Sequence, residues 1–256
     1  MFLRSPADIC IYGGAAGGGK TYALLLECLR HIDNKLFEAV IFRQSRPQIM
    51  SAGGLYATSQ EIYPHLGASS VLTPNVQWRF QSGAKVTFAH MFYEKEKYNW
   101  QGSQIPLLMF DELVHFTESQ FFYMFSRNRS TCGVRPYIRA TCNPDGESWV
   151  ARFIDWWIDP ETGYADESRC GKLRYFIRRN NIIHWADTPQ QLYEEFHLYS
   201  PEEMEEVKSV SFISAKLTDN AAMMKHDPGY IGALKAMSEF DQEQLLNGNW
   251  KIRRSA

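Results

Sequence analysis

The sequence predicts an α/β protein in which a mostly parallel sheet is flanked by helices. Strand-like and helix-like segments alternate through the first 145 residues, and several of the strand-like segments are short, uninterrupted apolar runs. Strands that alternate with helices favour a parallel sheet, because parallel neighbours need crossover connections. Apolar runs indicate that helices cover both faces of that sheet.

The first two predicted strands enclose a helix. Ile9–Tyr12 is a short apolar strand, Tyr22–Ile32 carries apolar residues at helical spacing, and Ala39–Phe42 is apolar again. Together they predict a βαβ unit. Lys85–Ala89 predicts a further strand.

Two more strands and a helix follow before residue 145. Leu107–Phe110 reads as a fully buried strand, and Tyr137–Cys142 as another. Between them, Thr117 and Gln120 have the spacing of a capping box and precede the apolar run Phe121–Phe125, which predicts a helix start.

Beyond residue 145 the pattern is less regular. Trp149–Ile158 predicts an aromatic helix and Leu173–Ile177 a strand. Thr188 and Ser200 each precede a proline and are followed at the third position by Gln or Glu, so both predict helix starts. The acidic run Glu194–Glu206 predicts a solvated helical face.

Composition excludes several classes of protein. The 256 residues are 45% hydrophobic and 14% aromatic, which is too apolar for a disordered or fibrous chain. A net charge of −2, with 27 basic and 29 acidic residues, argues against a surface covered by nucleic acid and leaves a local basic patch open. The apolar stretches fall far short of the roughly 20 residues that span a bilayer. The N-terminus lacks the tract of a signal peptide, so we expect residence in the cytoplasm.

The cysteines predict neither a zinc site nor a disulfide framework. None of the five forms a C-x-x-C pair, and all lie in apolar segments. We therefore expect five buried thiols, at Cys10, Cys28, Cys132, Cys142 and Cys170.

The strongest motif is a phosphate-binding loop of the form G-x-x-x-x-G-K-T between the first strand and its helix. Glycines allow the backbone to wrap phosphates and point N–H groups at them, and the helix adds its positive end. Lys20 reaches the phosphates as a charge, and Thr21 supplies a hydroxyl ligand for Mg²⁺. The predicted ATP-binding residues are Gly14, Ala15, Ala16, Gly17, Gly18, Gly19, Lys20 and Thr21.

A second motif is the buried strand Leu107–Phe110 followed by two carboxylates. We expect Asp111 to ligate Mg²⁺ and Glu112 to polarise the water that attacks the γ-phosphate. Adjacent Asp and Glu indicate a motor-type ATPase, in which an extra strand separates the loop strand from the carboxylate strand. The alternative is the solvated end of a strand with no chemical role.

A third motif follows about 30 residues later, at the end of Tyr137–Cys142. Thr141 and Asn143 carry a hydroxyl and an amide that can bond the γ-phosphate or the attacking water and so report which nucleotide is bound. Because Asn-Pro is also an ordinary turn initiator, this motif alone leaves both interpretations open.

With these motifs in this order, the chain resembles the ATPase portion of the large terminase subunit, the DNA-packaging motor of tailed bacteriophages. Gly14–Thr21 resembles its Walker A loop, Leu107–Glu112 its Walker B motif, and Thr141–Pro144 its coupling motif. Further similar segments are Tyr98–Gln104, Leu217–Asn220, Asp227–Tyr230 and Gln244–Trp250.

The resemblance implies a RecA-like (ASCE) P-loop NTPase that hydrolyses ATP with Mg²⁺ and translocates double-stranded DNA into a procapsid. It implies an ATPase core at residues 1–180 and a small lid or linker subdomain at 181–256. The implied partners are DNA, the portal protein, the small terminase subunit and further copies in a ring, with a monomer possible in isolation. The implied location is the bacterial host cytoplasm, at the procapsid portal. Because relatives continue into a nuclease domain and this sequence stops just after Trp250, we expect no DNA cleavage by this chain.

One departure concerns the arginine finger that many relatives carry just before Walker B. Gln101 stands at that position here, and glutamine supplies no cation to the charge that develops on the γ-phosphate. Arg127 and Arg129 are the alternatives, acting on a neighbouring subunit, and Arg129 is the first choice. Arginines that close a helix C-terminus explain this pair equally well. Arg43 and Arg46 are further candidates for phosphate sensing or DNA contact.

The densest basic stretch, residues 169–179, is the candidate DNA-binding surface. On a strand, Lys172, Arg174 and Arg178 share one face and would line a pore without reading sequence. A solvated edge strand with protective charges is the alternative. Two other functions also stay open: a different RecA-like translocase or helicase, and a portal-docking module that binds ATP with little turnover.

Overall fold

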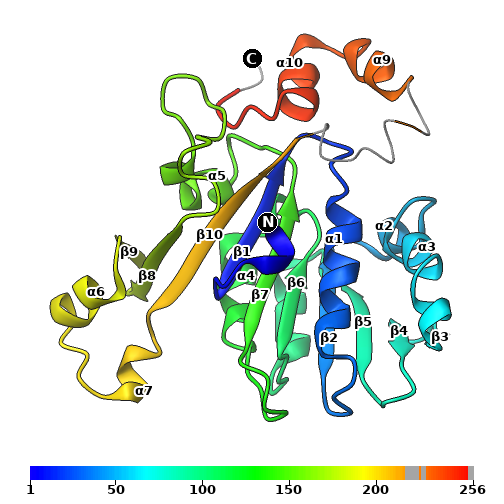
Figure 1. Ribbon diagram of the computed structural model, residues 1–256, viewed down its shortest axis with the longest axis horizontal. Helices are drawn as coiled ribbons and strands as arrows, with labels where there is room; N and C mark the ends of the chain where they lie inside the picture. Colours follow the sequence, from blue (N-terminus) through cyan, green and yellow to red (C-terminus); the bar gives the residue numbers. More distant parts are fainter. Residues whose placement is uncertain (217–224, 226–228, 253–256) are drawn as a thin grey trace.

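The computed structural model describes residues 1–216, 225 and 229–252, so Leu217–Asn220 and Asp227–Pro228 of the family-like segments lie outside the described residues. Within this part of the chain, ten strands form one sheet in the order β3-β4-β5-β2-β6-β7-β1-β10-β8-β9 (Figure 1). The strands are β1 (Ile9–Gly14), β2 (Glu38–Arg43), β3 (Ser69–Val71), β4 (Val76–Arg79), β5 (Lys85–His90), β6 (Leu107–Phe110), β7 (Tyr137–Cys142), β8 (Leu173–Arg179), β9 (Ile182–Ala186) and β10 (Lys208–Ala215).

The centre of the sheet is parallel, as the sequence predicts. From β5 through β2, β6, β7 and β1 to β10, every neighbouring pair is parallel. Antiparallel strands extend this centre on both sides: β4 and β3 beyond β5, and β8 and β9 beyond β10. The predicted extra strand is confirmed, because β7 lies between β1 and β6.

The helices are short. The α-helices are α1 (Lys20–Glu27), α2 (Arg46–Met50), α3 (Leu55–Gln60), α4 (Glu118–Phe125), α5 (Trp149–Phe153), α6 (Pro189–Glu195), α7 (Pro201–Met204), α9 (Tyr230–Lys235) and α10 (Glu239–Asp241). The 3₁₀ turns are η1 (Phe2–Arg4), η2 (Cys28–His31), η3 (Tyr63–Leu66), η4 (Glu94–Trp100), η5 (Leu113–His115) and η6 (Asp155–Trp157), and η8 (Gln242–Leu246) is a π turn.

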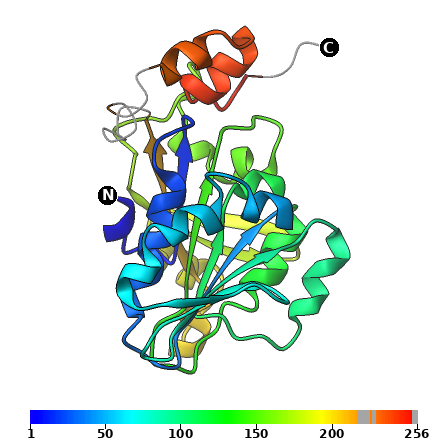
Figure 2. The same ribbon diagram turned by 90° about the vertical axis from the view of Figure 1, so that its right-hand side faces the viewer.

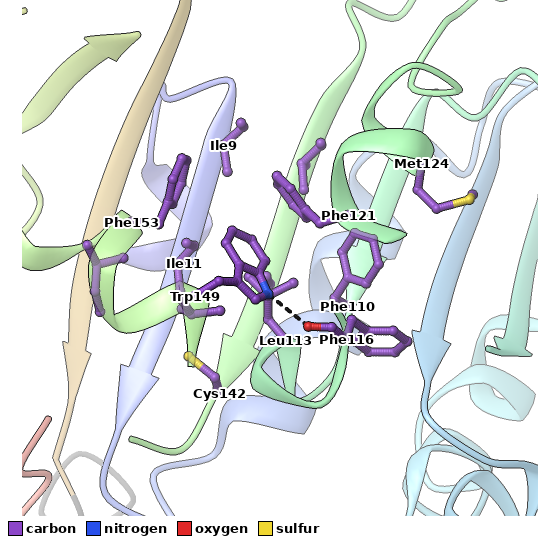
Figure 3. Close-up of a cluster of buried hydrophobic side chains, with 14 of the residues drawn as sticks. Ile9, Ile11, Phe110, Leu113, Phe116, Phe121, Met124, Cys142, Trp149 and Phe153 are labelled. Atoms are coloured by element: carbon purple, nitrogen blue, oxygen red, sulfur yellow. Dashed lines mark hydrogen bonds between the residues drawn. The ribbon is translucent and has the colours of Figure 1, made fainter. Parts of the chain in front are cut away.

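Each face of the sheet has its own hydrophobic core. On one face, apolar residues of α1 and α3 pack against β2, β4 and β5. On the other, α4 and α5 pack over β1, β6 and β7, with Phe110, Phe121 and Trp149 in ring contact (Figure 3). The indole N–H of Trp149 donates to the carbonyl of Phe116 at 2.8 Å, which links α5 to the segment before α4. Cores on both faces confirm the predicted burial of the sheet.

Several predicted elements match closely, and others differ for local reasons. The bounds of β6 and β7 coincide with the prediction, and Thr117 caps α4 by accepting from the backbone N–H of Gln120 at 3.0 Å. The predicted helix Trp149–Ile158 is wrong as one element, because the backbone of Ile154 leaves the helical region between α5 and η6. The acidic run is solvated but forms two short helices, since His197 has a positive φ of 55° between them.

Two further expectations differ from the structure. Cys132 and Cys170 are only half-buried, so the prediction of five buried thiols holds for Cys10, Cys28 and Cys142 alone. The basic stretch of β8 does not form a free cationic face. Arg174 pairs with Asp187 and Arg178 with Glu118, and both guanidinium groups lie over aromatic rings.

The predicted domain boundary after residue 180 falls in the turn between β8 and β9, two strands that pair with each other. The next strand, β10, pairs with β1 and so completes the centre of the same sheet. The division into core and lid stays a prediction, and sheet continuity favours placing it after Ala215.

The C-terminal helices lie over one end of the sheet. Figures 1 and 2 both show α9 and α10 above the end at which β1 and β10 finish. The backbone N–H of Ala16 donates to the carbonyl of Leu245 at 2.7 Å, and Leu234 packs against Ala15. The C-terminal segment therefore contacts the glycine-rich loop directly. In the described part of the chain, no helix is both long and apolar enough to cross a membrane.

Candidate nucleotide-binding site

The glycine-rich loop connects β1 to α1, as its motif requires, and its shape depends on glycine, as Gly14 and Gly19 illustrate. Gly14 has a φ of 140°, and a Cβ there would lie 2.4 Å from the carbonyl oxygen of Ala215 on β10. Gly19 precedes α1 in the left-handed region, with a φ of 76°. Side chains disfavour both conformations, so glycine lets the loop turn tightly against β10.

Lys20 is buried within this loop, at 7% exposure. Its ammonium donates to the carbonyls of Gly14 and Ala15 at 3.1 and 2.6 Å and to Oδ1 of Asn143 at 2.9 Å. Burial lowers the pKa of Lys20, and the charge of Glu112 acts in the opposite direction. These three contacts hold the lysine at the loop.

Asp111 lies at the end of β6 with both carboxylate oxygens occupied. Oδ1 accepts from the hydroxyl of Thr141 at 2.8 Å, and Oδ2 pairs with the guanidinium of Arg43 at 3.2 Å. Burial raises the pKa of Asp111, and the charge of Arg43 opposes that shift. The third motif and the end of β2 therefore meet at this carboxylate.

Glu112 and Asn143 form a second contact between the same two strand ends. Oε2 of Glu112 accepts from the backbone N–H of Asn143 at 2.9 Å, and Oε1 accepts from its side-chain amide at 3.1 Å. Glu112 has a φ of 62°, which is uncommon for a residue other than glycine. This left-handed residue ends the strand and lets Asp111 and Glu112 make separate contacts.

The three motifs of the sequence thus converge at the carboxyl ends of β1, β6 and β7. A continuous chain of contacts runs from Lys20 through Asn143 to Glu112. Thr21 follows Lys20 in the first turn of α1 and is half-buried. The structure brings Lys20, Asn143 and Glu112 together and places Thr21 next to Lys20 in the chain, while their chemical roles stay predictions.

The structure does not bring Arg129 to this site. It is exposed, and its guanidinium donates to the carbonyl of Ser103 at 3.2 Å. The neighbouring Arg127 carbonyl accepts from the N–H of Ile105, just before the amino end of β6, whereas Glu112 follows its carboxyl end. Gln101 is exposed at the end of η4. Action of Arg129 on a neighbouring subunit stays a prediction.

The oxygen donors suit Mg²⁺. A carboxylate and a hydroxyl, from Asp111 and Thr21, are the hard ligands that this ion takes alongside nucleotide phosphates, which provide further oxygens. Among the described residues no group of three or more His, Cys, Asp and Glu side chains is arranged to hold a metal by itself. A site of this kind therefore fits Mg²⁺ that arrives with a nucleotide.

Three features of the site are not evident from the motifs. One is the Arg43–Asp111 ion pair, for which the only signal is an arginine at the end of a strand. Another is β10, whose Ala215 carbonyl accepts from the N–H of Ala15 at 2.9 Å. The third is a cavity of about 620 Å³ beside α1, lined in part by Phe2, Arg4, Tyr12, Ala23 and Ser214.

Residues 11–256 match the family described as terminase large subunit, T4likevirus-type, N-terminal. The chain belongs to this family. The resemblance inferred from the motifs is confirmed, and so is the expected fold class, since the solved terminases below share it. A search of curated proteins found no match to this terminase chain.

Solved terminases share the fold at low sequence identity. The large terminase of a thermophilic bacteriophage superposes with a TM-score of 0.56 at 14% identity, over 96% of this chain and 49% of that one. The same terminase in complex with ATP-gamma-S gives a TM-score of 0.55 at 15% identity, over the same shares of the two chains. The large terminase ATPase domain of Thermus phage P74-26 gives 0.52 at 11% identity, over 96% of this chain and 90% of that domain. The chain thus spans about half the length of the first of these terminases.

Proposed function

We propose that this terminase chain is the ATP-hydrolysing motor that moves double-stranded viral DNA into a procapsid. The observation that carries the proposal is the bonded path from Lys20 through Asn143 to Glu112. It links the group expected to hold the phosphates to the group expected to activate water. Family membership and the structural likeness to the P74-26 ATPase domain support it.

The proposed chemistry assigns one task to each side chain. Loop N–H groups and Lys20 bind the β- and γ-phosphates. Asp111 and Thr21 would hold Mg²⁺, and the bound ion would supply positive charge beside the phosphates. Glu112 accepts two hydrogen bonds from Asn143, which fix its carboxylate in a position suited to orient water and take its proton. Thr141 and Asn143 contact both carboxylates and are placed to transmit loss of the γ-phosphate to β7.

The cavity beside α1 is our proposed site for the nucleotide base. Its lining residue Tyr12 donates its hydroxyl to the carbonyl of Gly18 at 3.2 Å, so the cavity adjoins the phosphate loop. Phe2 stacks on Tyr12 with ring centroids 5.3 Å apart, which gives the cavity an aromatic wall. A volume of about 620 Å³ suits a ligand of nucleoside size.

The partners follow from the motor role. We propose that the chain works as a ring of copies at the portal of a procapsid, in the host cytoplasm, with duplex DNA and the small terminase subunit. An exposed arginine such as Arg129 is then available to a neighbouring copy. Each of these points rests on the proposed motor role.

Phosphate release measured with and without duplex DNA tests the proposal. We expect DNA to stimulate release by the native chain, Lys20→Ala to weaken nucleotide binding, and Glu112→Gln to keep binding while release falls roughly 10²-fold or more. Glu147→Gln, an exposed carboxylate in the loop after β7, is the matched control and should behave as native. Unchanged hydrolysis in Glu112→Gln would remove that residue's assignment.

ATP-binding and strand-separation assays, run beside phosphate release, distinguish the alternatives. Tight ATP binding with negligible turnover, even with DNA and portal present, would favour a nucleotide-gated docking module. Separation of DNA strands would favour a helicase.

A further inference from the structure

Arg43 occupies the carboxylate that the proposed function gives to the metal. It ends β2, the strand next to β6, and its guanidinium lies 3.2 Å from Oδ2 of Asp111. The other oxygen of that carboxylate accepts from Thr141 at 2.8 Å. Both oxygens are engaged and only 5% of the residue is exposed, so a metal ion that binds Oδ2 must share that oxygen with Arg43 or displace it.

The guanidinium of Arg43 is only partly engaged. Its side chain is 20% exposed, and Asp111 is the one carboxylate within ion-pair distance among the residues that the structure describes. A guanidinium carries five N–H donors in a planar fork. Most of that donor capacity is available to a second anion beside Asp111.

A metal ion and a guanidinium compete for one carboxylate oxygen, because each is a cation and each neutralises the same charge. If Oδ2 turns to Mg²⁺, Arg43 must either leave or find another anion. The γ-phosphate is the anion that accompanies Mg²⁺ to this carboxylate, and its oxygens match the guanidinium fork.

We propose that Arg43 is a displaceable counter-ion that pairs with Asp111 when no ATP is bound and transfers to the γ-phosphate when ATP and Mg²⁺ bind. The exchange rests on the proposed function and goes beyond it, because it gives the site a means to distinguish ATP from ADP. ADP brings no γ-phosphate, so Arg43 keeps Asp111.

Two binding measurements on the full chain test the exchange. In the first, Mn²⁺ is titrated into the ADP-bound chain, with protein in excess over ADP, and is followed by electron paramagnetic resonance. We expect Arg43→Gln to bind Mn²⁺ at least about threefold more tightly, because the competing guanidinium is gone. In the second, calorimetry compares ATP-γ-S with ADP. We expect Arg43→Gln to weaken ATP-γ-S about tenfold or more, as for loss of one charge-assisted contact, and ADP less than about threefold.

Two further variants keep the test decisive. Arg43→Lys retains the charge and so protects Asp111 if the glutamine variant folds poorly; we expect near-native Mn²⁺ affinity and a partial loss of ATP-γ-S affinity, since the fork is missing. Arg46→Gln is the matched control, because that guanidinium donates to the carbonyls of Leu72 and Pro74 and should leave both measurements unchanged.

Unchanged Mn²⁺ affinity in Arg43→Gln, or an equal weakening of both nucleotides, would overturn the exchange. If the native chain bound neither ADP nor ATP-γ-S, the proposed function itself would fail. If it bound both nucleotides and Arg43→Gln left the Mn²⁺ affinity unchanged, the exchange alone would fail.

Discussion

At the scale of single residues, the site is organised by contacts between strand ends. Asn143 contributes most of them: its backbone N–H and side-chain amide bind Glu112, and its Oδ1 accepts from Lys20. A short side chain with one acceptor and one donor group is what this bridge requires. Aspartate at this position would face Glu112 with a like charge.

We expect Asn143→Ala to reduce hydrolysis more than nucleotide binding. Lys20 keeps its two loop carbonyls, so ATP-γ-S affinity should fall less than about threefold, whereas loss of the amide leaves Glu112 misplaced and costs roughly 10- to 10²-fold in turnover. Single-turnover kinetics measure the rate of hydrolysis, and calorimetry measures the affinity for ATP-γ-S. A matched fall in affinity and turnover would show that Asn143 serves binding instead.

Sequence reasoning locates most of these residues, because the motifs state both residue type and order along the chain. Gly14–Thr21, Asp111, Glu112, Thr141 and Asn143 all lie at one edge of the sheet, as their positions after strands require. From the sequence, Arg43 is only one of several candidate arginines, because an arginine at the end of a strand does not indicate which carboxylate it will pair with. An ion pair between residues 68 positions apart depends on strand order, which local patterns do not encode.

At the scale of elements, Trp149 connects α5 to the loop that follows the acidic pair. We expect Trp149→Phe to keep the ring packing of Figure 3 and lose the bond to the Phe116 carbonyl, leaving a buried acceptor unpaired at a cost of about 1–3 kcal/mol in the free energy of unfolding. Urea denaturation followed by circular dichroism measures it. Trp156→Phe is the matched control, because Trp156 is only half-buried and contacts Arg169 and Arg174 through its ring face. An equal loss in both variants would contradict the role of the hydrogen bond.

Elements with a uniform apolar run or a cap are predictable, and elements set by long-range pairing are not. β6 has four buried residues in a row and α4 has its Thr117 cap, so the sequence predicts both correctly. It does not predict β10, although that strand is the neighbour of β1, because serines interrupt its apolar residues. Ser211 is nevertheless fully buried in the sheet, so tertiary packing overrides its polarity.

At the scale of the whole molecule, the C-terminal segment is fixed to the sheet near the loop. Trp250 is 2% exposed and packs edge-on against Phe212 of β10. The backbone N–H of Trp250 donates to the carbonyl of Gly163 at 2.8 Å. Gly146, after β7, lies beneath this segment: a Cβ there would meet the carbonyl oxygen of Trp250 at 2.7 Å.

We therefore expect Gly146→Ala to displace the segment and expose the loop. The N–H groups of Ala16 and Trp250, bonded to Leu245 and Gly163, should exchange with deuterium at least about tenfold faster. Gly232→Ala is the matched control, because a Cβ there meets nothing within 4 Å and alanine suits the helix α9. Native exchange rates in Gly146→Ala would show that the segment accommodates the methyl group.

The position of β7 between β1 and β6 fixes the width of the proposed nucleotide site. Two inter-strand spacings separate the loop strand from the carboxylate strand, or roughly 10 Å, which leaves room for a phosphate chain and its ion to lie across the strand ends. Backbone hydrogen bonds set that width, so changes in side chains barely alter it. Residues of β7 such as Ala140 thereby act as spacers. They take no part in the proposed reaction, yet their backbone connects the loop strand β1 to the carboxylate strand β6.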